Sequence, residues 1–256
     1  MLELRNIHKY YNPGTVNEMC LFEDFNLTIN QGEFVSVVGS NGSGKTSMLN
    51  IICGSIPVES GQILIDGKDI TRVKEYKRNQ KIGRVYQNPS MGTCPSMTIL
   101  ENMSLADNKG RFYGLGRGTN KARIDYYREQ LAQLGLGLED KLHVKVGSLS
   151  GGQRQAASLL MATIAEPELL LLDEHTAALD PGAAEKVMAL TKKIVEENKI
   201  TTLMITHDME YALEYGSRTI MLDSGKIVMD LTGKEREEMT TGKLAELFYG
   251  KAHKRG

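Results

Sequence analysis

The stretch that decides the fold reads GSNGSGKTS and consists of Gly39, Ser40, Asn41, Gly42, Ser43, Gly44, Lys45, Thr46 and Ser47. It fits the phosphate-binding loop pattern G-x-x-x-x-G-K-[ST] in full. Residues 34–38 before it form a short apolar run rich in β-branched side chains, which is typical of a buried parallel strand. Residues 48–52 after it place apolar side chains on neighbouring faces of a predicted helix. Because strand, loop and helix occur in this order, we expect a site for nucleotide phosphates rather than a glycine-rich turn that binds nothing.

The chemistry of this loop follows from its residue types. Glycines allow a tight curl that brings backbone N–H groups against phosphate oxygens, and the N-terminus of the following helix adds a favourable dipole. We expect the Lys45 ammonium to contact the β- and γ-phosphates and the Thr46 hydroxyl to be a ligand for Mg²⁺.

Composition limits the remaining possibilities. At 256 residues the chain is long enough for one large domain or a compact pair of lobes. Its 31 Lys and Arg residues and 32 Asp and Glu residues leave a net charge of −1, so no overall field favours direct binding of nucleic acid. Cys20, Cys53 and Cys94 lack the spacing of a metal site, and we expect reduced thiols. The sequence shows no signal-peptide pattern and no run of about 18 apolar residues, so we expect any membrane-spanning part in other chains.

Two adjacent acids follow the most apolar segment of the chain. Residues 169–172 are four leucines, and Asp173 and Glu174 come directly after them. Parallel sheets place their chemistry at the carboxyl ends of the strands, and neighbouring residues on a strand point to opposite faces. Asp173 therefore suits the Mg²⁺ shell and Glu174 suits polarising a water for attack on the γ-phosphate. The alternative is an ordinary junction between a strand and a loop.

A second helix start has the composition of an anion site. Ser150 precedes two glycines and Gln153, and apolar residues at helical spacing follow. Ser150 could act only as the N-cap of this helix. Alternatively, its hydroxyl and the free N–H groups behind it could bind an anion.

Three further features have two interpretations each. His207 follows the predicted strand 201–205 and is either structural or part of the phosphate site, since it leaves the sheet at the same edge. Tyr11 could stack on an adenine base or pack on the core. Residues 72–81 hold five basic side chains, for which we expect a solvated face rather than a binding patch: Arg72, Lys74, Lys77, Arg78 and Lys81.

In this order, the motifs resemble those of the ATP-binding subunits of ABC transporters over nearly the whole chain. The matching segments are Walker A at 39–47, the Q-loop glutamine at Gln87, the LSGGQ signature at 149–153, Walker B with its catalytic glutamate at 169–174, the D-loop at 178–180, the switch histidine at His207 and the A-loop aromatic residue at Tyr11. The resemblance implies ATP and Mg²⁺ as cofactors. The residues expected to contact the nucleotide are Tyr11, the loop from Gly39 to Ser47, Gln87, Ser150, Gly152, Gln153 and Asp180.

The resemblance also implies the division of roles among the site residues. Catalysis is expected to depend on Glu174, His207 and Lys45. The expected Mg²⁺ ligands are Thr46, Gln87 and Asp173.

The same resemblance implies an α/β P-loop NTPase fold with a mixed central sheet, an N-terminal antiparallel β-subdomain and an inserted helical subdomain. Residues 1–256 are expected to form one ATPase domain, with 1–88 and 167–256 as its core and 89–166 as the helical subdomain that carries the signature. Two copies are expected to stack head to tail, so that each ATP lies between Walker A of one chain and the signature of the other.

The expected partners are transmembrane permease subunits, with an extracytoplasmic substrate-binding protein, and the expected location is the cytoplasmic face of the cell membrane. We expect an importer, because no membrane domain is fused to the chain; an exporter with separate subunits is the other possibility. From a different class, the alternative is a non-transport ABC ATPase, such as one that assembles iron–sulfur clusters.

One position departs from the family's usual Asp-Glu-Pro-Thr. Here His175 stands in place of the proline, which frees a backbone φ angle and adds an N–H group. We interpret it as a tolerated substitution rather than a catalytic group. The resulting Asp-Glu-His-Thr resembles a branch of uptake ATPases for aromatic or other hydrophobic amino acids.

Overall fold

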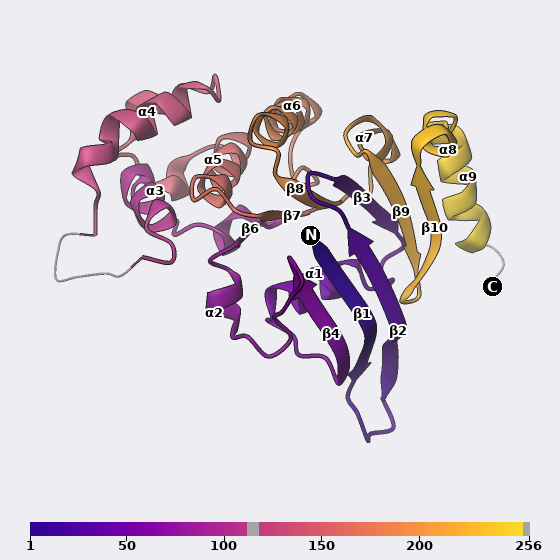
Figure 1. The fold of residues 1–256 in the computed structure, drawn as a ribbon. Helices are drawn as coiled ribbons and strands as arrows, with labels where there is room; N and C mark the ends of the chain where they lie inside the picture. Colours follow the sequence, from indigo (N-terminus) through magenta and orange to yellow (C-terminus); the bar gives the residue numbers. More distant parts are fainter. Residues whose placement is uncertain (112–117, 253–256) are drawn as a thin grey trace. The chain divides into compact units, whose positions relative to one another are not determined.

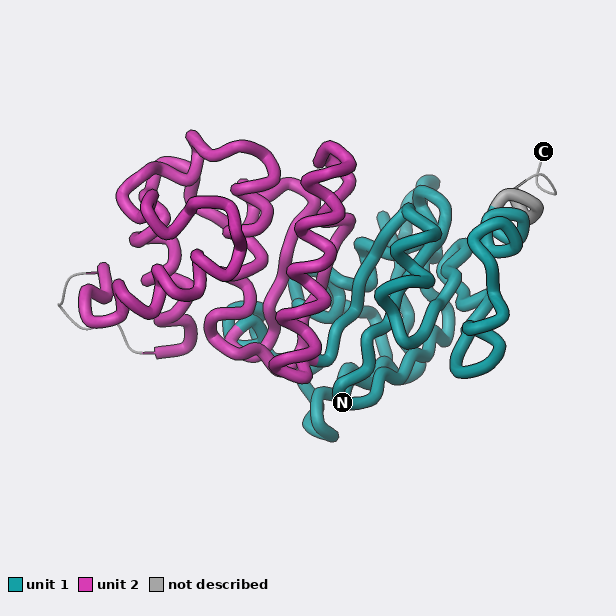
Figure 2. Tube along the Cα trace, turned by 90° about the horizontal axis from the view of Figure 1, so that it is seen from above, with its two compact units in different colours: residues 1–79, 201–256 teal, residues 80–200 magenta. Residues whose placement is uncertain are grey.

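The computed structural model describes residues 1–111 and 118–252 (Figure 1). Within it the chain forms two compact units, one built from residues 1–79 and 201–256 and the other from residues 80–200 (Figure 2). Among the described residues, no helix has both the length and the apolar character that crossing a membrane requires.

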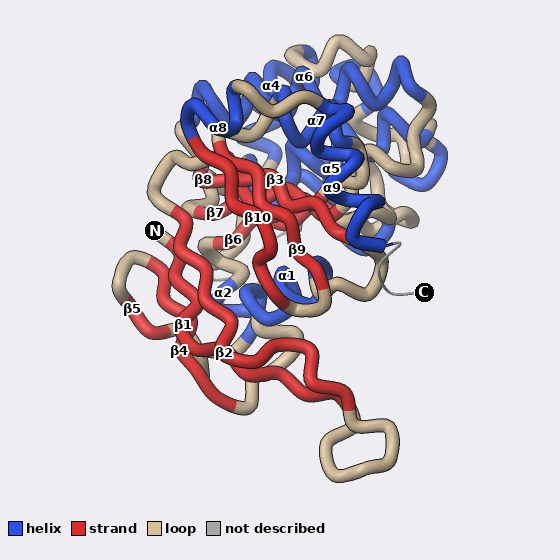
Figure 3. Tube along the Cα trace, turned by 90° about the vertical axis from the view of Figure 1, so that its right-hand side faces the viewer, coloured by secondary structure: helices blue, strands red, loops and turns tan. Residues whose placement is uncertain are grey.

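The first unit contains an antiparallel sheet in the order β2-β1-β4-β5. Its strands are β1 (Leu2–Tyr11), β2 (Met19–Ile29), β4 (Ser60–Ile65) and β5 (Lys68–Asp69). The β1–β2 hairpin is long, and its loop projects from the end of the two strands (Figure 3). Asn6 and Asp24 have positive φ angles of 48° and 51°, and the pairing register of β1 and β2 shifts beside them. Bulges of this kind let the hairpin twist while one face stays buried.

A second set of strands in this unit is mostly parallel and runs in the order β10-β9-β3-β8. The bounds are β3 (Phe34–Gly39), β8 (Thr201–Ile205), β9 (Arg218–Asp223) and β10 (Lys226–Thr232). β3 pairs in parallel with both β8 and β9, and β9 pairs antiparallel with β10. Every residue of β3 is buried, as the apolar run 34–38 predicts.

The helices of the first unit are α1 (Lys45–Cys53), α2 (Glu75–Arg78), α7 (Met209–Glu214), α8 (Gly233–Glu237) and α9 (Thr241–Ala252). The basic segment 72–81 is largely solvated, as expected, with one exception. Arg78 is only 6% exposed. Its guanidinium donates to the Ile51 and Ile52 carbonyls at the end of α1, over 2.9 and 3.1 Å, and to the Thr71 and Val73 carbonyls over 2.7 and 2.8 Å. The expectation of a solvated face was wrong for Arg78, because helix-end carbonyls need donors.

The second unit pairs β6 (Ile82–Val85) with β7 (Leu169–Asp173) in parallel. Its α-helices are α3 (Ile99–Asp107), α4 (Ile124–Ala132), α5 (Gly151–Thr163) and α6 (Pro181–Asn198). Buried side chains of α3, α4 and α5 share one hydrophobic core, which includes Met103, Tyr127 and Leu160. Residues 99–107 and 124–132 thus form helices inside the segment 89–166, for which the resemblance implies a helical subdomain.

A buried polar group fixes α3 against α4. The Tyr127 hydroxyl donates to the Asp107 carboxylate over 2.8 Å, and Arg123 Nε lies 2.9 Å from the same oxygen. Burial and this carboxylate raise the pKa of Tyr127 to about 12. Because each member has a partner, the group is buried without a large desolvation cost.

Candidate nucleotide-binding site

The glycine-rich loop joins β3 to α1 inside the first unit. Gly44 is the N-cap of α1, has a φ of 105° and makes no side-chain cap bond. A Cβ at Gly44 would lie 2.9 Å from the Phe22 ring, and one at Gly39 would lie 2.2 Å from the Leu222 carbonyl oxygen. Only glycine fits at these two positions, so the start of α1 presents backbone N–H groups without a side-chain cap.

Two side chains of this loop, those of Lys45 and Ser43, can donate hydrogen bonds to an anion. Lys45 is 6% exposed, and its ammonium donates to the Gly39 and Ser40 carbonyls over 2.7 and 3.0 Å. The buried Ser43 hydroxyl has no hydrogen-bond partner among the described residues. An ammonium, a hydroxyl and a helix N-terminus with no side-chain cap form a set that accepts an anion, so the loop fits the phosphates of a nucleotide.

Tyr11 lies at the end of β1, beside the last residue of the loop. Its hydroxyl is 3.0 Å from the Ser47 hydroxyl, and the Lys9 ammonium lies 5.6 Å from the centre of its ring. Lys9 in turn forms an ion pair with Glu59 at 2.8 Å. The ring is half-buried and is held beside the loop, and its stacking on adenine stays a prediction.

His207 leaves the sheet at the same edge as the loop. β8 runs parallel to β3 with Ile205 opposite Val37, and the Thr206 N–H donates to the Val37 carbonyl over 3.2 Å. The next residue, Asp208, caps α7 by accepting from two backbone N–H groups. The structure thus places His207 where the sequence predicted, while its role in catalysis stays a prediction.

In the second unit, Asp173 ends β7 and is 7% exposed. Arg84 Nη2 lies 3.0 Å from Asp173 Oδ2, and the guanidinium lies 4.5 Å from the centre of the Tyr86 ring. Sequence reasoning missed Arg84. The sequence shows a charged residue inside the apolar strand β6, but it does not show the partner of that residue. The register of β6 and β7 places Arg84 opposite Leu171, and the side chain of Arg84 pairs with Asp173, two residues further along β7.

Gln87 lies shortly after β6, and Glu174 directly follows the neighbouring strand β7. The side chain of Gln87 is exposed. The residue before it, Tyr86, accepts a hydrogen bond at its carbonyl from the Gln155 amide on α5, at 3.1 Å. This bond attaches the start of the Gln87 segment to the signature helix.

The segment after β7 begins with an unusual backbone conformation. Glu174 has a φ of 47° and is half-buried. His175 is fully enclosed, and its Nε2 lies 3.2 Å from the Thr191 hydroxyl on α6. Burial lowers the pKa of His175 to about 4, so its imidazole is neutral at physiological pH.

Ser150 is the N-cap of α5, in a reciprocal arrangement with Gln153. The Gln153 N–H donates to the Ser150 hydroxyl and the Ser150 N–H donates to the Gln153 side chain, both over 3.3 Å. The Gln153 amide also donates to the Leu136 carbonyl over 3.2 Å. The N-cap interpretation is confirmed, and a role for Ser150 in anion binding stays a prediction.

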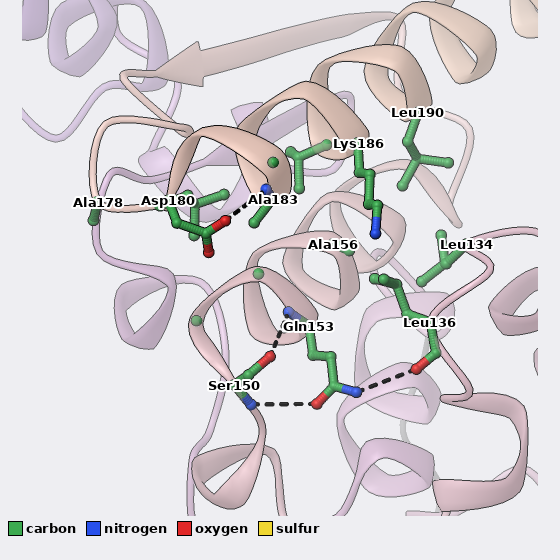
Figure 4. A pocket seen from close by; sticks show the side chains of 15 residues that line it. Leu134, Leu136, Ser150, Gln153, Ala156, Ala178, Asp180, Ala183, Lys186 and Leu190 are labelled. Atoms are coloured by element: carbon green, nitrogen blue, oxygen red, sulfur yellow. Dashed lines mark hydrogen bonds between the residues drawn. The ribbon is translucent and has the colours of Figure 1, made fainter.

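Within the second unit, the signature and the D-loop line one cavity of about 510 Å³ (Figure 4). Gly152 and Gln153 lie in the first turn of α5, which Ser150 caps. Asp180 caps α6 by accepting from the Ala183 N–H over 3.0 Å. A Cβ on Gly152 would lie 3.0 Å from the Ala183 Cβ, so the starts of the two helices approach closely. The structure therefore brings together the signature and D-loop residues that the sequence singled out separately.

Comparison with known proteins decides the family. A family model described as "ABC transporter" matches residues 22–177, which contain the loop, the signature and the two acids. The chain belongs to the ABC transporter family.

Two relatives illustrate the range within ABC transporters. The "Tyrosine transport ATP-binding protein" of Clostridioides difficile (strain R20291) is 48% identical over 97% of this chain and 98% of its own length. The "Spermidine/putrescine import ATP-binding protein PotA" of Haemophilus influenzae (strain ATCC 51907 / DSM 11121 / KW20 / Rd) is 35% identical over 98% of this chain, which spans 63% of that relative.

Solved structures agree with this assignment to ABC transporters. A dimeric ATP-binding cassette in a post-hydrolysis state, bound to ADP and phosphate, is 34% identical and matches with a TM-score of 0.77. The match covers 91% of this chain and 98% of the other. The expected P-loop fold, with its mixed sheet and antiparallel sheet, is confirmed. The chain is an ABC ATPase, which binds and hydrolyses ATP to power a transporter.

Proposed function

We propose that this ABC ATPase powers an importer for aromatic or other hydrophobic amino acids. The observation that supports the direction and the cargo is the 48% identity, over nearly the full length of both chains, to a tyrosine transport ATP-binding protein. The relatives described above are transport subunits, so the iron–sulfur alternative finds no support among them.

We assign the following roles to the site residues. The loop from Gly39 to Ser47 binds the phosphates, and Tyr11 stacks on adenine. Glu174 orients the attacking water, while Lys45 and His207 contact the γ-phosphate.

A magnesium ion fits the residue types present. Thr46, Gln87 and Asp173 offer hydroxyl, amide and carboxylate oxygens, the ligands that Mg²⁺ prefers. When bound there, Mg²⁺ neutralises charge on the phosphates during transfer.

The proposed active unit is a head-to-tail homodimer. Ser150, Gly152, Gln153 and Asp180 of one copy would contact the ATP held by the loop of the other copy. A single copy would then bind ATP and hydrolyse it poorly. Because the γ-phosphate is held from both sides, its removal would favour the open state, which is a shift between two states with different affinities for ATP and ADP.

The chain would work at the cytoplasmic face of the cell membrane, with permease subunits and a substrate-binding protein as partners. We propose that residues 1–256 form one ATPase domain. Its core consists of residues 1–88 and 167–256, and its helical subdomain consists of residues 89–166.

The variant Glu174→Gln tests the catalytic proposal. We expect ATP to bind with unchanged affinity, turnover to fall at least about a hundredfold because the water loses its base, and an ATP-bound dimer to accumulate. Turnover by steady-state phosphate release, nucleotide affinity by fluorescence and mass by light scattering give the three readouts. Near-normal turnover would remove Glu174 from its role.

Cargo and direction need a separate measurement. The chain can be co-expressed with a candidate permease and reconstituted in vesicles that contain a candidate binding protein. In these vesicles, we expect ATPase activity that tyrosine or a similar amino acid stimulates. Stimulation by no hydrophobic amino acid would contradict the proposed cargo and would leave the ATPase assignment intact.

A further inference from the structure

His175 is buried. It directly follows Glu174, the proposed catalytic residue, and precedes the D-loop at 178–180. It is 2% exposed, and the residue before it, Glu174, has a φ of 47°. Positive φ angles are uncommon for residues other than glycine, and surrounding contacts must hold them. The contacts of His175 therefore bear on the placement of Glu174.

The hydrogen bond between His175 and Thr191 has a defined direction. Thr191 is fully buried, and its hydroxyl donates its single proton to the Val187 carbonyl over 2.8 Å. It can therefore only accept from His175 Nε2, which lies 3.2 Å away. This requires the tautomer that carries its proton on Nε2.

This bond ties the segment 174–180 to α6 at a second point. At one end, Asp180 caps the N-terminus of α6 through the Ala183 N–H. At the other end, His175 contacts Thr191, deep in the same helix. Between them, the Ala177 N–H donates to the Glu174 carbonyl over 3.0 Å, which closes a turn. Both ends of the segment are thus fixed to α6, the helix that also lines the signature cavity.

We propose that His175 is a positioning residue, which sets the backbone of Glu174 relative to α6 through its hydrogen bond to Thr191. In this chain the imidazole replaces the conformational restraint that a proline gives at the same position in the family. The inference rests on the proposed role of Glu174 in orienting the attacking water. A displacement of about 1 Å at such a group is enough to slow the chemical step without weakening nucleotide binding.

Four variants of the full chain test the bond itself. His175→Leu and Thr191→Val each remove the bond with little change in volume. His175→Gln and Thr191→Ser keep a donor or an acceptor. Thr163→Val is the matched control, because Thr163 is also a buried helical threonine whose hydroxyl donates to a carbonyl four residues earlier, at 3.0 Å. Among the described residues, no histidine has a hydrogen bond to Thr163.

We expect His175→Leu and Thr191→Val each to lower kcat for ATP about tenfold, with a nucleotide Kd within about twofold of the original. The double variant with both His175→Leu and Thr191→Val should have a kcat no lower than that of either single variant, because both changes remove the same bond. His175→Gln and Thr191→Ser should restore most of kcat, and Thr163→Val should keep it. Thermal unfolding in each case shows whether the fold persists.

Two results would overturn the proposal. One is a folded His175→Leu protein with kcat within about twofold of the original. The other is independent, additive losses in the double variant, which would show that the two side chains act separately. The Glu174→Gln protein distinguishes this failure from that of the proposed function: if it turns over normally, Glu174 is not the catalytic group, whatever the His175 variants do.

Discussion

Two ion pairs, one at the start of β6 and β7 and one within them, show how burial changes the contribution of an ion pair to stability. Lys81 and Glu168 lie 2.6 Å apart with side chains 52% and 39% exposed, and they precede the two strands. Arg84 and Asp173 lie 3.0 Å apart with side chains 8% and 9% exposed. Exposed pairs gain little because water solvates each charge, whereas removing one member of a buried pair leaves the other uncompensated.

We therefore expect Arg84→Met to lower the free energy of unfolding by about 3 kcal/mol or more. The matched change Lys81→Met should cost less than about 1 kcal/mol. Chemical denaturation of both proteins gives the comparison. Equal losses would mean that the Arg84 pair is solvated, and that Asp173 does not depend on it.

The lowered pKa of the buried His175 imidazole should make the stability of the protein depend on pH. Its pKa is about 4 in the folded protein against 6.5 ordinarily, so folding favours the neutral form. The stabilisation is complete above pH 6.5 and is lost as the pH falls from 6.5 toward 4, where the unfolded state binds a proton and the folded state does not. Each unit of pKa corresponds to about 1.4 kcal/mol, so the loss approaches about 3 kcal/mol.

Denaturation of the original protein and of His175→Gln at pH 7 and pH 4.5 isolates this effect. The pKa values of Glu59, Asp69 and Glu101 are also lowered, mainly by hydrogen bonds that oppose desolvation, but they titrate in both proteins. The original should lose more stability on acidification than the glutamine variant. Parallel losses would show that His175 is solvated.

At the scale of elements, the helix that follows the phosphate loop depends on a side chain far along the sequence. The guanidinium of Arg78 binds two carbonyls at the end of α1 and two in the segment before α2. A Cβ at Gly54, the residue after α1, would lie 2.8 Å from Arg78 Nε, so a glycine leaves room for the cap. The end of α1 is thus fixed by a tertiary contact as well as by its own backbone.

Arg78→Met should destabilise the protein by about 3 kcal/mol, because it removes four hydrogen bonds to carbonyls around the end of α1. Lys77→Met, the neighbouring exposed position, should change stability by less than about 0.5 kcal/mol. Thermal and chemical unfolding provide the measurement. If the two variants were equally stable, water would have to satisfy these carbonyls.

The same scale shows what could be predicted from sequence and what could not. The fully buried strands β3, β7 and β8 consist mostly of apolar residues, and the helix α5 has a serine start. These elements have local signals, and each forms at the expected residues. No strand was predicted for β2, because the bulge at Asp24 interrupts the alternation that marks a half-buried strand. Its existence depends on pairing with β1, which is a long-range property.

The residues of the candidate site also divide into those with a local sequence signal and those that depend on a distant partner. The loop, the two acids and the signature carry their own motifs and could be found by reading the chain. Arg84 and Thr191 could not, because each matters only through a partner on another element. His175 was noticed as a departure from the family pattern, but a role for it required the contact with α6.

At the scale of the whole molecule, one chain carries both sets of residues that we propose to contact the nucleotide. The phosphate loop lies in the first unit, and the Ser150 cap and the D-loop lie in the second. The central claim is that these halves act in pairs from two copies, with one copy holding the triphosphate and the other covering it. Membership of the ABC transporter family and the dimeric cassette matched by the fold support this arrangement.

The most direct test is a crystal structure of the Glu174→Gln protein grown with ATP and Mg²⁺. We predict a dimer in which ATP binds the loop 39–47 of one copy and its γ-phosphate lies within hydrogen-bonding distance, about 3 Å, of the Ser150 hydroxyl of the other copy. ATP bound to the loop with Ser150 remote from every γ-phosphate, in every assembly in the crystal, would contradict the account.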